Sequence, residues 1–360
     1  MKPNRMLIVG VIALLCVVNP LFAKGTKDTE SAKPAQVQSA EPVKAAPSSD
    51  AAAIVPVKPE KPEIVRMSVL NGPSGIGMVP LFEKAPDLNG IPSSFEVSAS
   101  PQVLLPKLLK GEVDAGILPI NVAAKVYTAN KQAVLLAAIT GNGMLSVISR
   151  DTSVKSLADL KGKKLTVAGQ GGTPDYMIRY LARSEGIELN TADGIEIDFS
   201  IPTPEIVPAL LAGKIDYALV PEPFSTVASI KDKTIARVLD VQKLYEKACG
   251  IEGCEYPVMA LVVRKAFAEK YPATLELFLQ ACKESVEAVN ADPKAAGDLV
   301  EKHTLGLKAP IVAASVPRSA FVWQSARESR QNVERLLSVF AEFAPESIGG
   351  KLPDDGFYLK

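Results

Sequence analysis

Three glycine-rich turns are the features of this sequence best suited to binding a small molecule. Residues 71–77 and 169–174 each place several backbone amides ahead of a predicted helix, and residues 140–143 add the side chains of Thr140 and Asn142. The partial positive charge at a helix start favours an anion or a carbonyl oxygen. Neither of the first two turns is a P-loop or a GxGxxG dinucleotide site. One such turn is more often only a tight turn, but three at strand ends predict a ligand site.

Several carboxylates could act beside these turns. Glu222 lies in a Pro-Glu-Pro segment that follows a predicted strand, and two roles stay open for it: a carboxylate in the binding cleft, or a first-turn acid that complements the helix dipole. Asp114 and Asp216 resemble a catalytic pair. They occupy matched positions in two similar segments, however, which favours a structural role for each.

The chain offers little for metal, redox or nucleophilic chemistry. Its single histidine, His303, lies on a polar stretch where we expect a solvated side chain, so zinc sites and Ser-His-Asp hydrolases lack their imidazoles. Cys249 and Cys254 are spaced for a small disulfide in an exported protein, with two free thiols as the open alternative. Cys282 lies in an apolar helical stretch, where we expect it to be buried. We expect no cofactor and no metal.

The composition narrows the class of protein. The 360 residues carry 40 basic and 40 acidic side chains, so the basic footprint of a nucleic-acid-binding protein is missing. Hydrophobic residues make up 47% of the chain, which is enough to bury a core. The length predicts two domains or lobes once the tails are removed.

The first 62 residues have the pattern of an export signal followed by a spacer. Residues 1–23 have a basic start, 13 apolar residues at 6–18 and a small residue, Ala23, before a polar stretch. The apolar run is shorter than the roughly 20 residues of a membrane span. Cys16 keeps lipid attachment open, although no small residue precedes it. Residues 24–62 are rich in Pro, Ala, Ser, Lys and Glu, and we predict a disordered tether.

From Ile64 onward, short β-rich runs alternate with helical stretches, which predicts βαβ units on mostly parallel sheets. An internal repeat supports this α/β class. Residues 104–119 align with residues 206–221, each a helix ending at a glycine, a buried strand and a closing proline. Two copies, each within its own run of strands and helices, predict two similar lobes. The tail from 267 to 343 is predicted to be helical, with breaks near residues 293, 310 and 317.

With these motifs together, the chain resembles the periplasmic substrate-binding proteins of ABC importers, in the nitrate/sulfonate/taurine and thiamine-precursor group (NMT1/THI5-like). The resemblance covers residues 64–345. The motifs that carry it are SLADLKGKKL at 156–165, GGT at 171–173, LAGKID at 211–216, PEP at 221–223 and VVRKAF at 262–267.

The resemblance implies a type II binding-protein fold with two lobes, 63–144 plus 258–360 and 145–257. Two hinge crossings, near 145–149 and 257–262, would join them. It implies a non-enzymatic, monomeric periplasmic protein that captures a small molecule and docks on a permease and its ATPase. The implied ligand-binding residues are Ser74, Gly75, Thr140, Gly141, Asn142, Gly171, Gly172, Thr173, Pro174 and Glu222. Unlike oxyanion-binding members, this sequence has no Arg or Lys inside those loops, so the ligand stays open.

Two alternatives remain. Enzymes of menaquinone or pyrimidine biosynthesis look similar in outline, and fold alone does not settle function. An export signal and a lone histidine away from the loops argue against that interpretation. The other alternative is an exported sensor domain that works without a permease.

Overall fold

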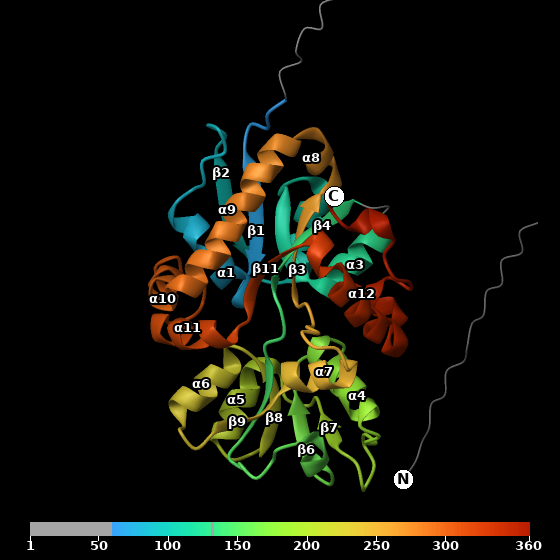
Figure 1. Cartoon of the computed structure of the whole chain (residues 1–360). Helices are drawn as coiled ribbons and strands as arrows, with labels where there is room; N and C mark the ends of the chain where they lie inside the picture. The colour runs from blue at the N-terminus through green and yellow to red at the C-terminus, as the bar shows by residue number, and fades with distance from the viewer. Residues whose placement is uncertain (1–59, 131–132) are drawn as a thin grey trace, which may run out of the picture. The chain divides into compact units, whose positions relative to one another are not determined.

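The computed structural model describes residues 60–130 and 133–360. The predicted signal segment and nearly all of the predicted tether therefore lie outside the described residues. No helix within these ranges has the length and apolar character to cross a bilayer. The described chain forms two β-sheets flanked by helices (Figure 1), which confirms the predicted α/β fold class with two lobes.

The first sheet has six strands in the order β11-β4-β10-β3-β1-β2. Their bounds are β1 (Val65–Leu70), β2 (Ser93–Ser98), β3 (Ala115–Pro119), β4 (Val134–Gly141), β10 (Met259–Arg264) and β11 (Phe321–Ser325). The second sheet has five strands in the order β7-β6-β8-β5-β9. Their bounds are β5 (Leu145–Ser149), β6 (Lys164–Val167), β7 (Glu196–Asp198), β8 (Tyr217–Pro221) and β9 (Ala236–Asp240).

The two sheets share one arrangement. β7-β6-β8-β5-β9 matches β2-β1-β3-β10-β4 strand for strand in order and direction. Most strands in each sheet run the same way, as expected, but β5 and β10 run antiparallel to both of their neighbours. The reason is topological, because each of these two strands enters its sheet directly from the other lobe.

The sequence repeat occupies equivalent places in the two lobes. It comprises α2 (Pro101–Lys110) with β3 in the first lobe and α5 (Thr203–Leu211) with β8 in the second. Gly111 and Gly213 end the two helices at φ +79° and +67°, in the left-handed region that favours glycine. The repeat therefore marks a duplicated helix–strand unit at the centre of each sheet.

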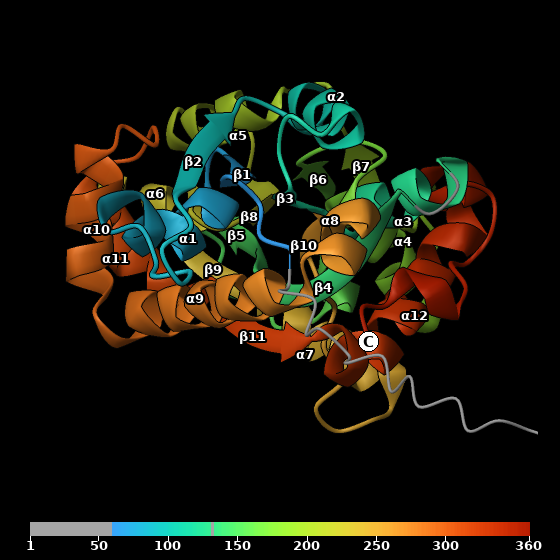
Figure 2. The ribbon, with the colours of Figure 1, turned by 90° about the horizontal axis from the view of Figure 1, so that it is seen from above.

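Helices cover both faces of the first sheet. Figures 1 and 2 show α1 (Pro73–Glu83), α9 (Pro272–Ala291) and α10 (Pro293–Lys302) on one side, and α3 (Ile120–Ala129) with α12 (Ala326–Phe343) on the other. Strand β10 is buried, and its side chains pack against the helices on both faces of the sheet. Met259, Leu261 and Val263 pack into one core cluster, while Ala260 and Val262 pack into the other, as the period of two in a strand requires.

The remaining helices are α8 (Lys265–Lys270) and α11 (Ala309–Ser315) in the first lobe, and α4 (Thr173–Ser184), α6 (Phe224–Lys231) and α7 (Val241–Cys249) in the second. The helical tail breaks at the predicted prolines, since Pro293 and Pro310 stand in the first turns of α10 and α11. One prediction for this tail is wrong: residues 321–325 form strand β11. β11 is a short strand at the edge of the sheet, and it pairs with β4 alone.

Candidate ligand-binding site

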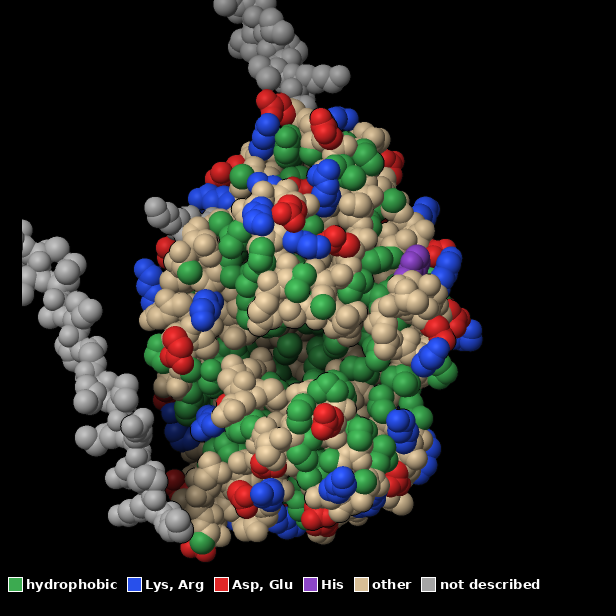
Figure 3. All heavy atoms as spheres, turned by 180° about the vertical axis from the view of Figure 1, so that it is seen from behind, with side chains coloured by type: hydrophobic (Ala, Val, Ile, Leu, Met, Phe, Trp, Pro, Cys, Tyr) green, Lys and Arg blue, Asp and Glu red, His purple; other side chains and the backbone are tan. Residues whose placement is uncertain are grey.

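A cavity of about 540 Å³ lies between the two sheets, at the ends of β1, β3 and β8. Both lobes contribute to its wall. The lining residues are 70–74, 117–119, 144, 221–224, 227, 258–259 and 305–307. Seen from behind, the molecule has a hollow between its lobes with hydrophobic side chains in its depth (Figure 3). Ligands collect at the carboxyl ends of strands in α/β sheets, so this position fits a binding site.

The first lobe brings the turn between β1 and α1 to the cavity. Ser74 is buried, and its Oγ accepts a hydrogen bond from the Leu70 amide at 3.0 Å and donates to the Leu70 carbonyl at 2.9 Å. The hydroxyl thus folds the turn back onto the end of β1. α1 begins at N-cap Gly72 with no side-chain cap and no acid in its first turn. Its positive end is therefore not neutralised by the helix itself.

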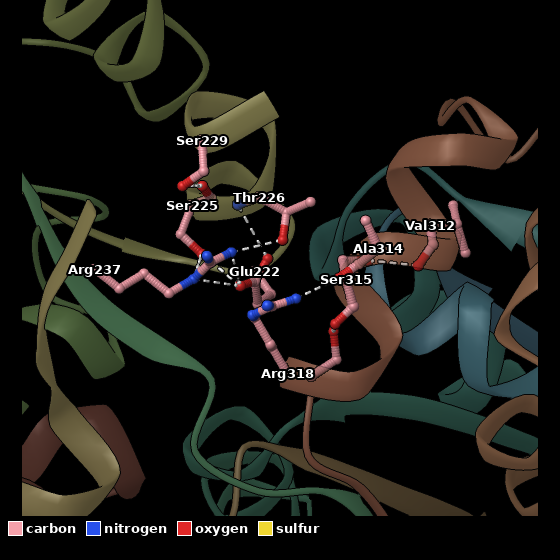
Figure 4. A network of polar contacts seen from close by, with 10 residues as sticks. Glu222, Ser225, Thr226, Ser229, Arg237, Val312, Ala314, Ser315 and Arg318 are labelled. Atoms are coloured by element: carbon pink, nitrogen blue, oxygen red, sulfur yellow. Dashed lines mark hydrogen bonds and ion pairs between the residues drawn. The ribbon is translucent and has the colours of Figure 1, made fainter. Parts of the chain in front are cut away.

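The second lobe brings Glu222, whose carboxylate is held by a network (Figure 4). Oε1 accepts from Ser225 Oγ at 2.5 Å and from Arg237 Nη2 at 2.7 Å, and Oε2 accepts from the Thr226 amide at 3.3 Å. Arg237 also donates to Thr226 Oγ1 at 2.7 Å. Glu222 is 2% exposed. It lines the cavity and, although it precedes α6 and is not in its first turn, it accepts the Thr226 amide from that turn.

Thr140, Gly141 and Asn142 are not among the lining residues of the cavity. Asn142 is buried and donates through Nδ2 to Glu255 at 2.6 Å. Glu255 in turn accepts from Gln324 of β11 at 2.9 Å. Asn142 follows β4 and Glu255 precedes β10, so this cluster joins the two segments by which the chain passes between the sheets. Gly141 lies at the end of β4, where its backbone approaches Met259.

The second lobe's glycine-rich turn also lies outside the lining of the cavity. The Gly171 amide donates to Asp175 Oδ2 at 2.9 Å, and Asp175 pairs with Arg179. Gly172, Thr173 and Pro174 form the start of α4. Of the ten predicted site residues, the structure brings only Ser74 and Glu222 to the cavity wall. Gly75 lies behind it, packed on Leu305.

The other residues singled out by the sequence are structural. Asp114 is buried and ties β1 to β10, since it accepts from the Arg66 amide at 3.0 Å and pairs with Arg264 at 3.2 Å. Burial raises the pKa of its carboxyl. Asp216 is exposed, so the two aspartates form no matched buried pair. Cys249 and Cys254 form a disulfide, and Cys282 is buried as expected.

His303 differs from its prediction as a solvated residue. Its side chain is 24% exposed, and Nε2 lies 2.9 Å from Glu83 Oε2. Lys302 bonds the same carboxylate at 2.7 Å. These bonds from Lys302 and His303 lower the pKa of Glu83 and tie the end of α10 to the end of α1.

Sequence reasoning missed most of the apolar wall. Met144, Val227 and Met259 line the cavity, as do Leu305 and Leu307 in the loop between α10 and α11. Apolar residues in a buried pattern give no signal that separates a cavity wall from a core. The Leu-Gly-Leu sequence at 305–307 was the available signal, since it places two large apolar side chains in a loop.

A second, polar cavity of about 390 Å³ adjoins the first, and Met144 and Glu222 line both. Arg237 and Arg318 also line it. Arg318 is exposed and donates to the Ala314 carbonyl near the end of α11 at 2.9 Å (Figure 4). The two guanidinium groups therefore lie beyond Glu222, not on the wall of the apolar cavity.

The two lobes also touch away from the cavity, where α4 meets α12. The Tyr176 and Phe340 rings lie 5.0 Å apart between centroids. Arg183 pairs with Glu342 and stacks 4.7 Å over the Phe343 ring. These contacts join side chains of both lobes across the cleft.

The sequence profile of the NMT1-like family matches residues 5–302. The chain belongs to the NMT1-like family. This confirms the resemblance found in the motifs, which lie on β5 to β10 and their connections. A search of curated proteins found no match.

Solved structures show the same fold. An ABC transporter protein from Parabacteroides distasonis is 26% identical, with a TM-score of 0.71 over 83% of this chain and 99% of that one. The periplasmic aliphatic sulphonate binding protein of Escherichia coli is 18% identical, with a TM-score of 0.65 over 83% and 93%. The periplasmic nitrate-binding protein of Synechocystis PCC 6803 is 13% identical, with a TM-score of 0.58 over 80% and 83%. This NMT1-like chain thus has the fold of the substrate-binding proteins of ABC transporters.

Proposed function

We propose that this protein is an extracytoplasmic solute-binding protein that captures a small molecule between its lobes and delivers it to an ABC permease. The observation that carries the proposal is the cavity of about 540 Å³ at the ends of β1, β3 and β8, with walls from both lobes. Its volume lies in the range of about 300–1,000 Å³ that is usual for small-molecule sites. The NMT1-like family and the fold of its neighbours agree with this function.

The proposal takes residues 63–144 with 258–360 as one lobe and 145–257 as the other. Ligand would close the lobes about the crossings that Asn142 and Glu255 join. The predicted signal segment would export the chain to the periplasm, where it would meet the permease and its ATPase as a monomer.

A binding role fits the cavity better than catalysis does. Within the described ranges, the only ionisable side chain on its wall is Glu222. Both oxygens of this carboxylate already accept hydrogen bonds, and Arg237 balances its charge. The network fixes this carboxylate in position, and no second ionisable side chain of the described residues lines the cavity to act with it.

The test is native mass spectrometry of the exported protein, purified without denaturation and compared with its denatured mass. We expect a small-molecule excess, whose mass names the ligand class. A ligand added at ~100 times its dissociation constant should then stabilise the protein by about 2.7 kcal/mol, a rise in Tm of several degrees. If a broad solute panel leaves both mass and Tm unchanged, the proposal is wrong.

A further inference from the structure

The wall of the apolar cavity carries no net charge toward a ligand. Of its 19 lining residues, 14 are apolar, two are glycine and three are polar. The polar three are Asn71, Ser74 and Glu222, and no Lys, Arg or His of the described chain is among the 19. An anionic ligand would therefore find no opposite charge on this wall, and the one carboxylate there, Glu222, is already paired with Arg237.

The two buried polar side chains are already satisfied. Ser74 Oγ both donates to and accepts from the backbone of Leu70. The Glu222 carboxylate is balanced by Arg237 at 2.7 Å and occupied by Ser225 and Thr226. Asn71 is exposed at the edge of the cavity. In the first turn of α1, Pro73 has no N–H and the amides of Gly75 and Ile76 donate to the Gly72 carbonyl at 3.1 Å, which leaves the Ser74 amide as a neutral donor.

Charge strongly affects which molecule can enter such a cavity. Moving an ion from water into apolar surroundings without a partner is far more costly than moving a neutral polar group. A neutral molecule, in contrast, gains from every apolar surface that it buries. The wall therefore selects against anions and cations alike.

We propose that the ligand is an uncharged, mainly apolar small molecule. Its apolar body lies against Leu118, Met144, Val227, Met259 and Leu307, and any polar end is a neutral acceptor that faces the first turn of α1. This inference rests on the proposed solute-binding function and names the substrate class of the same cavity.

The main rival is an anionic ligand that reaches into the polar cavity. Arg237 and Arg318 line that cavity, but Arg237 already pairs with Glu222. Arg318 is exposed to solvent, where screening weakens its attraction for an anion. An anion in that cavity would also lie beside Glu222, which lines both cavities. The experiment below separates the two ligands directly.

Two fluorescent probes differ almost solely in charge: N-phenyl-1-naphthylamine, which is uncharged at neutral pH, and 8-anilinonaphthalene-1-sulfonate, the same rings with a sulfonate. We expect one molecule of the neutral probe to bind per chain, at least about ten-fold more tightly than the sulfonate, since ten-fold is only about 1.4 kcal/mol. Equal or tighter binding of the sulfonate would overturn the inference.

A pair of matched variants tests whether the neutral probe binds in the apolar cavity. Val227→Asp puts a charge on the cavity wall and should weaken binding of the neutral probe at least about ten-fold. Ile230→Asp, on the same helix α6 but 41% exposed and outside the lining, should leave it unchanged. If Val227→Asp lowers Tm more than Ile230→Asp does, Leu307→Asp on the opposite wall takes its place. Unchanged binding in the cavity variant would overturn the inference.

A thermal-shift panel of nitrate, alkanesulfonates and neutral apolar solutes distinguishes failure of this ligand class from failure of the proposed binding function. If an anion raises Tm and the neutral probe does not bind, the ligand class is wrong and the binding function stands. If neither anions nor neutral solutes bind, the proposed function fails and the inference fails with it.

Discussion

The two lobes carry equivalent glycine-rich turns, β1 to α1 and β6 to α4, but they use them differently. The turn of the first lobe lines the cavity, and its helix has no acid in the first turn. The turn of the second lobe is closed on itself, because Asp175 accepts the Gly171 amide and is paired with Arg179. The two turns therefore differ in their acid: Asp175 of α4 accepts an amide of the second turn, whereas no acid in the first turn of α1 does so in the first.

Gly75→Val should give the largest effect in this comparison. A Cβ at Gly75 would lie 2.6 Å from Leu305 Cδ2 and 3.1 Å from the Leu70 carbonyl oxygen. Overpacking of this kind costs about 1–3 kcal/mol, and we expect the upper end because backbone lies on one side. Gly172→Val is the control, because its Cβ meets one backbone oxygen, that of Gly169, at 3.2 Å and no side chain closer than 3.8 Å; it should cost under about 1 kcal/mol. Urea unfolding measures both, and equal losses would contradict the comparison.

Ser74→Ala should give the next largest loss of stability. It removes the hydroxyl that holds both polar groups of Leu70, and a buried donor left unpaired costs about 1–3 kcal/mol. Thr173→Ala changes the matching part of α4. The Thr173 side chain makes no hydrogen bond within residues 60–130 and 133–360, and its loss should stay within about 0.5 kcal/mol. Thermal unfolding measures the loss of stability in both variants. A larger loss for Thr173→Ala than for Ser74→Ala would contradict the structural role assigned to the Ser74 hydroxyl.

Substitutions in the two turns should also differ in their effect on ligand affinity. Asn71→Trp places a bulky ring at the edge of the cavity and should weaken ligand binding about ten-fold, or about 1.4 kcal/mol. Gly172→Arg, in the other turn, should leave affinity within about two-fold. Titration with the ligand found by mass spectrometry measures both. A matching loss in Gly172→Arg would place residues 171–174 in the site, as the sequence predicts.

The smallest expected effect is a difference between the lobes in how stability depends on pH. Hydrogen bonds from Thr234 and Arg150 lower the pKa of Asp232 in the second lobe to about 2. Because this pKa lies below the unfolded value, the stabilisation is present above about pH 4 and disappears as pH falls toward 2. The stability difference between wild type and Asp232→Asn should shrink over that window.

Asp114 in the first lobe should show the opposite sign, because burial raises its pKa. The folded state then binds the proton more tightly than the unfolded state, so its ionisation lowers stability as pH rises above about 4. Urea midpoints of Asp114→Asn and Asp232→Asn against pH would show both trends. Parallel trends would contradict the assigned environments.

Much of the fold could be predicted from the sequence because its signals are local. The repeat at 104–119 and 206–221 marked the central helix and strand of each lobe, and glycine and proline marked their ends. Strand β11 was missed because its five residues, only one of them buried, follow a long helical pattern. The antiparallel insertion of β5 and β10 depends on long-range pairing, which no local pattern encodes.

The site was less predictable for a related reason. Polar loop residues such as Ser74 and Glu222 stand out in a sequence, and the structure places them on the cavity wall. Asn142 stands out equally, but its partners Glu255 and Gln324 are 113 and 182 positions away. Only the folded chain shows that it bonds to the second crossing instead of lining the cavity.

The placement of β10 also sets an order of assembly. β10 lies between β3 and β4, so the first sheet stays in two pieces until the chain has been made beyond residue 264. The second sheet needs only residues 145–240, which form one continuous stretch. During synthesis the second lobe can therefore fold before the first lobe is complete. Strands β1 to β4 can form their full sheet only after β10 has been made.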